Sequence, residues 1–120
     1  VYTALDPVRP ATTSPVVMRE VIRGAIGFDG LVMSDDVSMN ALSGSLEERA
    51  AASLAAGCDV VLHCNGDMGE MVQVARAAPL LAGEPARRAA AALRRCSHTP
   101  EPLDLVDARE RFAAALAMVA

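Results

Sequence analysis

Two short apolar runs, each preceded by a helical pattern that ends at a glycine, constrain the fold of this chain most. The runs are Leu-Val-Met at 31–33 and Val-Val-Leu at 60–62, and neither alternates apolar with polar residues. An uninterrupted run of this length is typical of a buried strand in a parallel sheet. The alternation of helices with such strands predicts an α/β fold, in which helices cover a parallel sheet.

Capping signals predict where the helices begin and end. Ser14 followed by Pro15 is an N-cap with proline in the first turn, and apolar side chains then recur at helical spacing up to Gly27. A Ser-Leu-Glu-Glu capping box at 45–48 begins a second helix that ends at Gly57. The chain then predicts three more helices, one from Asp67 to a stop at Pro79, one over 85–96 and one over 105–119.

Composition excludes several classes of partner. The 11 basic residues are scattered arginines against 15 acidic residues, so no basic stripe for nucleic acid is present. No apolar run approaches the roughly 18 residues of a membrane span, so we expect a soluble protein. Three cysteines without a Cys-x-x-Cys spacing argue against a disulfide framework or a zinc site, and favour a reducing compartment such as the cytosol.

The chain is expected to be a segment of a larger domain. It opens Val-Tyr-Thr, without an initiator methionine or a signal segment. Two or three strands cannot close a barrel, since a complete (β/α)8 barrel needs about 250 residues.

Asp35 and Asp36 follow the first apolar run directly. In parallel α/β folds the functional groups gather at the carboxyl ends of strands. A carboxylate there can attack an electron-poor carbon, bind a metal or accept a proton. From spacing alone, an aspartate that only caps the next turn explains the pair equally well.

Residues 27–39, Gly-Phe-Asp-Gly-Leu-Val-Met-Ser-Asp-Asp-Val-Ser-Met, resemble the nucleophile segment of family 3 glycoside hydrolases. They are most similar to the bacterial β-N-acetylhexosaminidases that recycle cell-wall fragments. Residues 2–6, Tyr-Thr-Ala-Leu-Asp, followed by Pro-Ala at 10–11 and Ser-Pro at 14–15, are similar to the sixth strand of that family and the loop leading to its next helix. Residues 55–65 resemble its eighth strand. The resemblance covers about 1–78 closely and the Ala-rich remainder only loosely.

The resemblance implies that residues 1–120 are the C-terminal portion of a (β/α)8 TIM barrel, about its last two to three β/α units, with no second domain. It implies a retaining glycosidase that releases terminal non-reducing β-linked N-acetylglucosamine from peptidoglycan fragments. The expected partner is such a saccharide or muropeptide, with no cofactor, no metal and no membrane. The expected location is cytoplasmic, and a monomer is expected.

Carried over residue by residue, the resemblance makes Asp35 the nucleophile that forms a covalent glycosyl-enzyme. Met39 matches a position that lines the sugar pocket, with a core residue at a helix start as the alternative. The acid/base of the family is a histidine paired with an aspartate on a mobile loop before this segment, so the segment alone is expected to be inactive. A second carboxylate in the pocket would oppose ionisation of Asp35, so we expect Asp36 to hydrogen-bond the barrel rim instead.

The other polar candidates receive structural interpretations. His63 is expected to point to the opposite face of its strand from Leu62 and Cys64, and to be a core or second-layer residue. His98 is expected in a solvated loop, Asn65 in a turn, and Asp6 with Arg9 in a local ion pair.

Two other functions compete with a glycosidase for this sequence. A phospho-acceptor receiver domain suits the length and the acidic pair, but a receiver carries that pair after its first strand and needs a lysine, which this chain lacks. A non-catalytic barrel remnant is the second rival, because an open piece of barrel would expose sheet edges and apolar helix faces.

Overall fold

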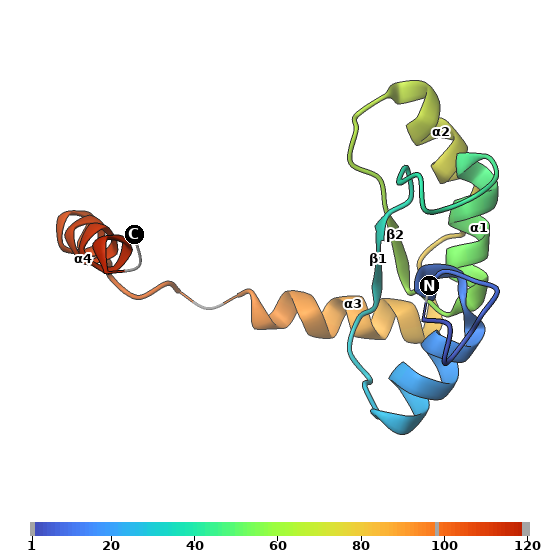
Figure 1. The fold of residues 1–120 in the computed structure, drawn as a ribbon, viewed down its shortest axis with the longest axis horizontal. Coiled ribbons are helices and arrows are strands. Elements are labelled where there is room, and N and C mark those ends of the chain that lie inside the picture. The colour runs from blue at the N-terminus through green and yellow to red at the C-terminus, as the bar shows by residue number, and fades with distance from the viewer. Residues whose placement is uncertain (1, 98, 119–120) are drawn as a thin grey trace.

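The computed structural model describes residues 2–97 and 99–118, and its elements alternate as an α/β protein. They are η1 (Ala11–Thr13), η2 (Val16–Ala25), β1 (Met33–Asp36), α1 (Leu46–Ala56), β2 (Val60–Leu62), α2 (Met68–Ala77), α3 (Gly83–Arg95) and α4 (Leu105–Ala117). Figure 1 shows α1 along one side of the two strands and α3 running across them near one end. The predicted α/β class is therefore confirmed.

The two strands pair in parallel, with Met33 opposite Val60 and Asp36 opposite Leu62. The second strand has the predicted limits, but the first begins two residues later than the apolar run and contains the acidic pair. The reason lies at Val32, whose N–H donates to the Asp59 carboxylate at 2.8 Å. Two parallel strands with their helices are compatible with part of a barrel.

The strand expected at residues 2–6 is wrong, because this segment forms a turn. The backbone N–H groups of Leu5 and Asp6 both donate to the carbonyl of Tyr2. The Asp6 carboxylate then accepts the Ser14 hydroxyl at 2.7 Å and the N–H of Val8 at 3.0 Å. An aspartate that serves local donors in this way favours a turn over an extended strand.

The capping predictions are confirmed at η2 and α1. Ser14 accepts the N–H of Val17 through its hydroxyl, at the start of η2. That helix is of the π type, and Ile26 N–H closes it on the carbonyl five residues back. Ser45 and Glu48 complete the capping box of α1, which ends at Gly57 with a φ of 131°.

The later helices also follow their sequence signals. Asp67 caps α2 through the N–H of Glu70, and the helix ends before Pro79. Helix α3 begins two residues before the predicted start, at Gly83. Helix α4 matches its predicted start, while the predicted end at Val119 lies outside the described residues.

The core consists of two small apolar clusters on the α1 side of the sheet. One joins η2 to the end of α1, and the other joins the β1 exit to α1 and α2. Their buried members are Met18, Ala56 and Cys58 in the first cluster and Val37, Leu42 and Leu46 in the second. Helices α2, α3 and α4 contain no buried residue in the described part.

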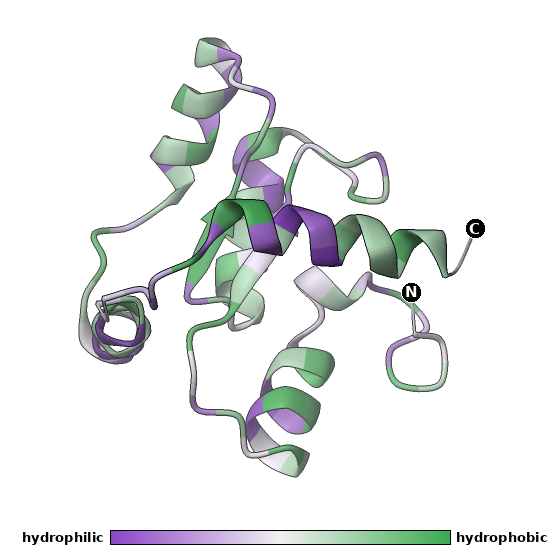
Figure 2. Ribbon diagram, turned by 90° about the vertical axis from the view of Figure 1, so that its left-hand side faces the viewer, coloured by the Kyte–Doolittle hydropathy of each residue, from purple (hydrophilic) through white to green (hydrophobic). Residues whose placement is uncertain are grey.

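Helix α4 lies apart from the sheet (Figure 1). It carries exposed apolar side chains, among them Leu105, Phe112 and Leu116, and Figure 2 shows polar and apolar segments mixed along the helices. In residues 2–97 and 99–118, no helix has both the length and the apolar character needed to cross a membrane.

A buried carboxylate ties the amino ends of both strands to two helices. The Asp59 side chain is 2% exposed and accepts from Arg23 at 2.7 Å and from Arg88 at 3.0 Å. The same carboxylate accepts the N–H of Val32, and the Asp59 N–H donates back to the Val32 carbonyl at 2.8 Å. One residue thus joins η2, β1, β2 and α3.

We predict that Asp59→Ala destabilises the chain by about 3 kcal/mol, because two arginines and a backbone N–H would lose their buried acceptor. The measurement is the free energy of unfolding in urea. The matched control is Asp29→Ala, whose exposed carboxylate also pairs with Arg88, and which should cost much less because solvent screens the pair. Equal losses for the two variants would contradict this account of the clamp.

Candidate active site

The side chains of β1 alternate between an open face and the helix-covered face of the sheet. Met33 and Asp35 are exposed, whereas Ser34 is buried and Asp36 partly buried. The Ser34 hydroxyl accepts the N–H of Leu62, which fixes it between the strands. Because side chains alternate along a strand, Asp35 projects from the open face at the carboxyl end of β1.

Asp36 is occupied by hydrogen bonds of its own turn. Its carboxylate accepts the Ser38 hydroxyl at 2.6 Å and the Ser38 N–H at 3.0 Å. The Ser38 hydroxyl lowers the pKa of Asp36 most, followed by the backbone N–H groups of Ser38 and Cys64. Asp36 is therefore engaged by its own turn, as expected, while the placement of that turn at a barrel rim stays a prediction.

The backbone of this turn orients Asp35. The Asp36 N–H donates to Oδ1 of Asp35 at 2.8 Å. That carboxylate is therefore aimed by one backbone donor while its side chain stays exposed. Two neighbouring carboxylates consequently serve different purposes, since one is accessible and the other is held by the turn.

Arg49 on α1 holds the loop that follows β1, and sequence reasoning missed it. Its guanidinium lies 3.2–3.4 Å from the carbonyls of Val37, Ser38 and Met39, and its Nε donates to the carbonyl of Gly44. An arginine one residue after the Ser45–Glu48 capping box was the available signal.

Met39 lies in this loop and is 44% exposed. Its alternative interpretation as a core residue at a helix start is therefore wrong, because the Arg49 guanidinium holds the segment as a turn. The side chain is free of the apolar clusters, as a residue available to a ligand must be.

His63 lies on the opposite side of the sheet from Asp35. Its side chain is 5% exposed, with Nδ1 3.8 Å from Asp36 and Nε2 3.3 Å from Glu70. The expectation of a core or second-layer histidine is confirmed. Asn65 holds a turn, as expected, by donating to Glu70 and accepting the N–H of Asp67.

The remaining polar residues that the sequence singled out form a local ion pair or lie outside the described residues. Asp6 and Arg9 form the expected local ion pair at 3.8 Å, while Ser14, the stronger partner of that aspartate, was not foreseen. His98 lies outside the described residues. Within the described ranges, no group of three or more His, Cys, Asp or Glu residues is placed to hold a metal ion.

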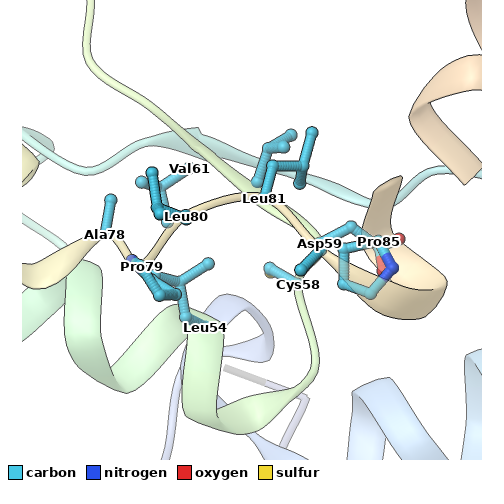
Figure 3. A pocket seen from close by; sticks show the side chains of 11 residues that line it. Leu54, Cys58, Asp59, Val61, Ala78, Pro79, Leu80, Leu81 and Pro85 are labelled. Atoms are coloured by element: carbon cyan, nitrogen blue, oxygen red, sulfur yellow. The ribbon is translucent and has the colours of Figure 1, made fainter. Parts of the chain in front are cut away.

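A hollow of about 400 Å³ lies at the amino end of β2, away from Asp35. Figure 3 shows apolar side chains from α1, β2 and the connection between α2 and α3 around it, including Leu54, Cys58 and Leu81. A second hollow lies at the amino end of β1, beside α3. Because neither is lined by Asp35 or Met39, we assign both to the scaffold.

The chain matches a known family and named relatives. The model of the glycosyl hydrolase family 3 N terminal domain matches residues 1–97. A beta-hexosaminidase of Tolumonas auensis is 46% identical over 71 residues, which is 58% of this chain and 21% of the relative. A beta-hexosaminidase of Alkalilimnicola ehrlichii is 49% identical over 67 residues, which is 54% of this chain and 19% of the relative.

A beta-hexosaminidase of Idiomarina loihiensis is 41% identical over 76 residues, which is 62% of this chain and 22% of the relative. The matched part of this chain thus spans about a fifth of the length of each of these relatives.

We predict that Cys58 reacts with a thiol reagent at pH 8 at least about 100-fold more slowly than Cys64 or Cys96, since the thiolate is the reacting species. Cys58 is buried and the other two are exposed. Burial raises the pKa of Cys58 to about 11. Timed alkylation followed by peptide mass spectrometry measures the three rates, and equal rates would show that the first apolar cluster does not protect this thiol.

Proposed function

Since the chain belongs to glycosyl hydrolase family 3, as its match over residues 1–97 shows, we propose that it supplies the nucleophile of a retaining β-N-acetylhexosaminidase. The single observation that carries the proposal is the placement of Asp35. It is exposed on the open face of β1, at the carboxyl end of a parallel strand, where α/β enzymes place their reactive groups.

In the proposed reaction an Asp35 carboxylate oxygen attacks the anomeric carbon of the sugar, and the bond to the leaving oxygen breaks. A general acid protonates that oxygen, and the same group then removes a proton from the water that hydrolyses the glycosyl ester. The attacking carboxylate must be ionised. The engagement of Asp36 with Ser38 supports this, because it keeps the second negative charge out of the reaction face.

The proposed substrate is a saccharide that ends in β-linked N-acetylglucosamine, and more finely a peptidoglycan fragment. The names of the relatives, beta-hexosaminidase, support the sugar class. Met39 is proposed to contact the sugar, since it lies in the loop after β1 and exposes its side chain.

The acid/base group is proposed to come from residues outside this chain, with residues 1–120 as the C-terminal part of a (β/α)8 barrel. The open face of the sheet and the exposed Met33 support this, because in a closed barrel that face would be covered. On this proposal the chain alone is inactive. Free thiols at all three cysteines fit a reducing compartment, and we propose the cytoplasm.

We predict that Asp35→Ala abolishes turnover in a complete barrel, with a loss of at least about 1,000-fold in kcat. Such a barrel is obtained by placing residues 1–97 into the corresponding segment of the Tolumonas auensis beta-hexosaminidase. The assay is release of nitrophenol from a nitrophenyl N-acetyl-β-glucosaminide.

Asp36→Ala is the matched control, and it should lose much less activity because this carboxylate only shapes the turn. Chain 1–120 on its own should show no turnover. The proposal fails if Asp35→Ala retains activity, or if the isolated chain cleaves the substrate as fast as the complete barrel.

A further inference from the structure

His63 is buried behind the carboxyl end of β1, which carries the acidic pair. It follows β2 on the helix-covered side of the sheet, and its two ring nitrogens face carboxylates from two other elements. Among the described residues neither nitrogen makes a hydrogen bond of acceptable geometry. A buried polar group without such a bond costs free energy, so the charge state of the ring matters.

Both neighbours of the ring are carboxylates, which accept hydrogen bonds. The number of protons on the imidazole therefore decides how many of them it can serve. An ionised carboxylate has no proton to donate, and a neutral imidazole donates from one nitrogen only. The other nitrogen would then direct a lone pair at a carboxylate oxygen. With a proton on both nitrogens, the ring would offer a donor to each side and would pair one positive charge with two negative charges.

The charged groups on the elements around the ring are each engaged with further partners. Glu70, on α2, also accepts from the side chain of Asn65. Asp36, on β1, is kept ionised by the hydroxyl and N–H of Ser38, which lower its pKa. Arg49, on α1, is engaged with the carbonyls of the loop after β1.

We infer that His63 is a positioning residue that bridges Asp36 and Glu70 and so fixes the orientation of Asp35. The connection runs from the first turn of α2 through the ring to the Asp36 carboxylate. The N–H of Asp36 then holds Oδ1 of Asp35 at 2.8 Å. This inference rests on the proposed nucleophilic role of Asp35.

The bridge also contributes to the stability of the fold. His63→Gln, which keeps an uncharged donor of similar size, should lower the urea concentration at which chain 1–120 unfolds, because Asp36 and Glu70 lose the group that lies between them.

The experiment combines this unfolding measurement with kinetics in the complete barrel described above. We expect His63→Gln to lower kcat on the order of tenfold with little change in KM, because the nucleophile is misaligned rather than removed. Glu70→Gln should have a similar effect, and the double variant should be no worse than either, since both break one bridge. Glu47→Gln is the matched control, an exposed glutamate in the first turn of α1 that should change nothing.

Each result supports or overturns the bridge. Effects of His63→Gln and Glu70→Gln that multiply, or unfolding of chain 1–120 that His63→Gln leaves unchanged, would overturn it. If His63→Gln does not fold, Glu70→Gln alone decides, because it leaves the ring in place and removes one of its carboxylates. Failure of the proposed function would appear separately, as an Asp35→Ala barrel that remains active while the unfolding results still follow the bridge.

Discussion

The buried Asp59 carboxylate is the constraint on which the rest of the structure depends. A short two-stranded sheet has little apolar area with which to fix its register. Asp59 supplies that register at the amino ends by binding Val32 through both backbone and side chain. The same carboxylate brings Arg23 and Arg88 from helices on either side, so η2 and α3 are attached at one point. A buried carboxylate of this kind is stable because three donors, two of them guanidinium groups, share its two oxygens.

The two ends of the sheet consequently have different tasks. The amino end carries the charged clamp, the hollows and the apolar cluster around Cys58. The carboxyl end carries Asp35, Asp36 and the loop that Arg49 holds. Alternation along β1 then separates the two carboxylates onto opposite faces, so that Asp35 is exposed and Asp36 is partly buried.

Local signals in the sequence predicted most of the elements, and long-range contacts explain the differences. The caps at Ser45 and Asp67 and the strand Val60–Leu62 depend on residues within a few positions, so they could be predicted. The later start of β1 depends on Asp59, 27 residues beyond Val32, which no local pattern contains. At the site, the separation of Asp35 from Asp36 was predicted from charge, because a second carboxylate in the pocket would oppose ionisation of Asp35. The Arg49 contacts, the Ser14 partner of Asp6 and the carboxylates on both sides of His63 required the fold.

The central claim is that Asp35 forms a covalent bond with the anomeric carbon, and a fluorinated N-acetylglucosaminyl analogue that traps this ester tests it most directly. Trypsin cleavage of the trapped complete barrel after Arg23 and Arg49 releases residues 24–49, which contain both Asp35 and Asp36. Fragmentation of that peptide should locate the added sugar mass on Asp35. An adduct on Asp36, on another side chain, or no adduct in an enzyme that turns over the ordinary substrate would contradict the account.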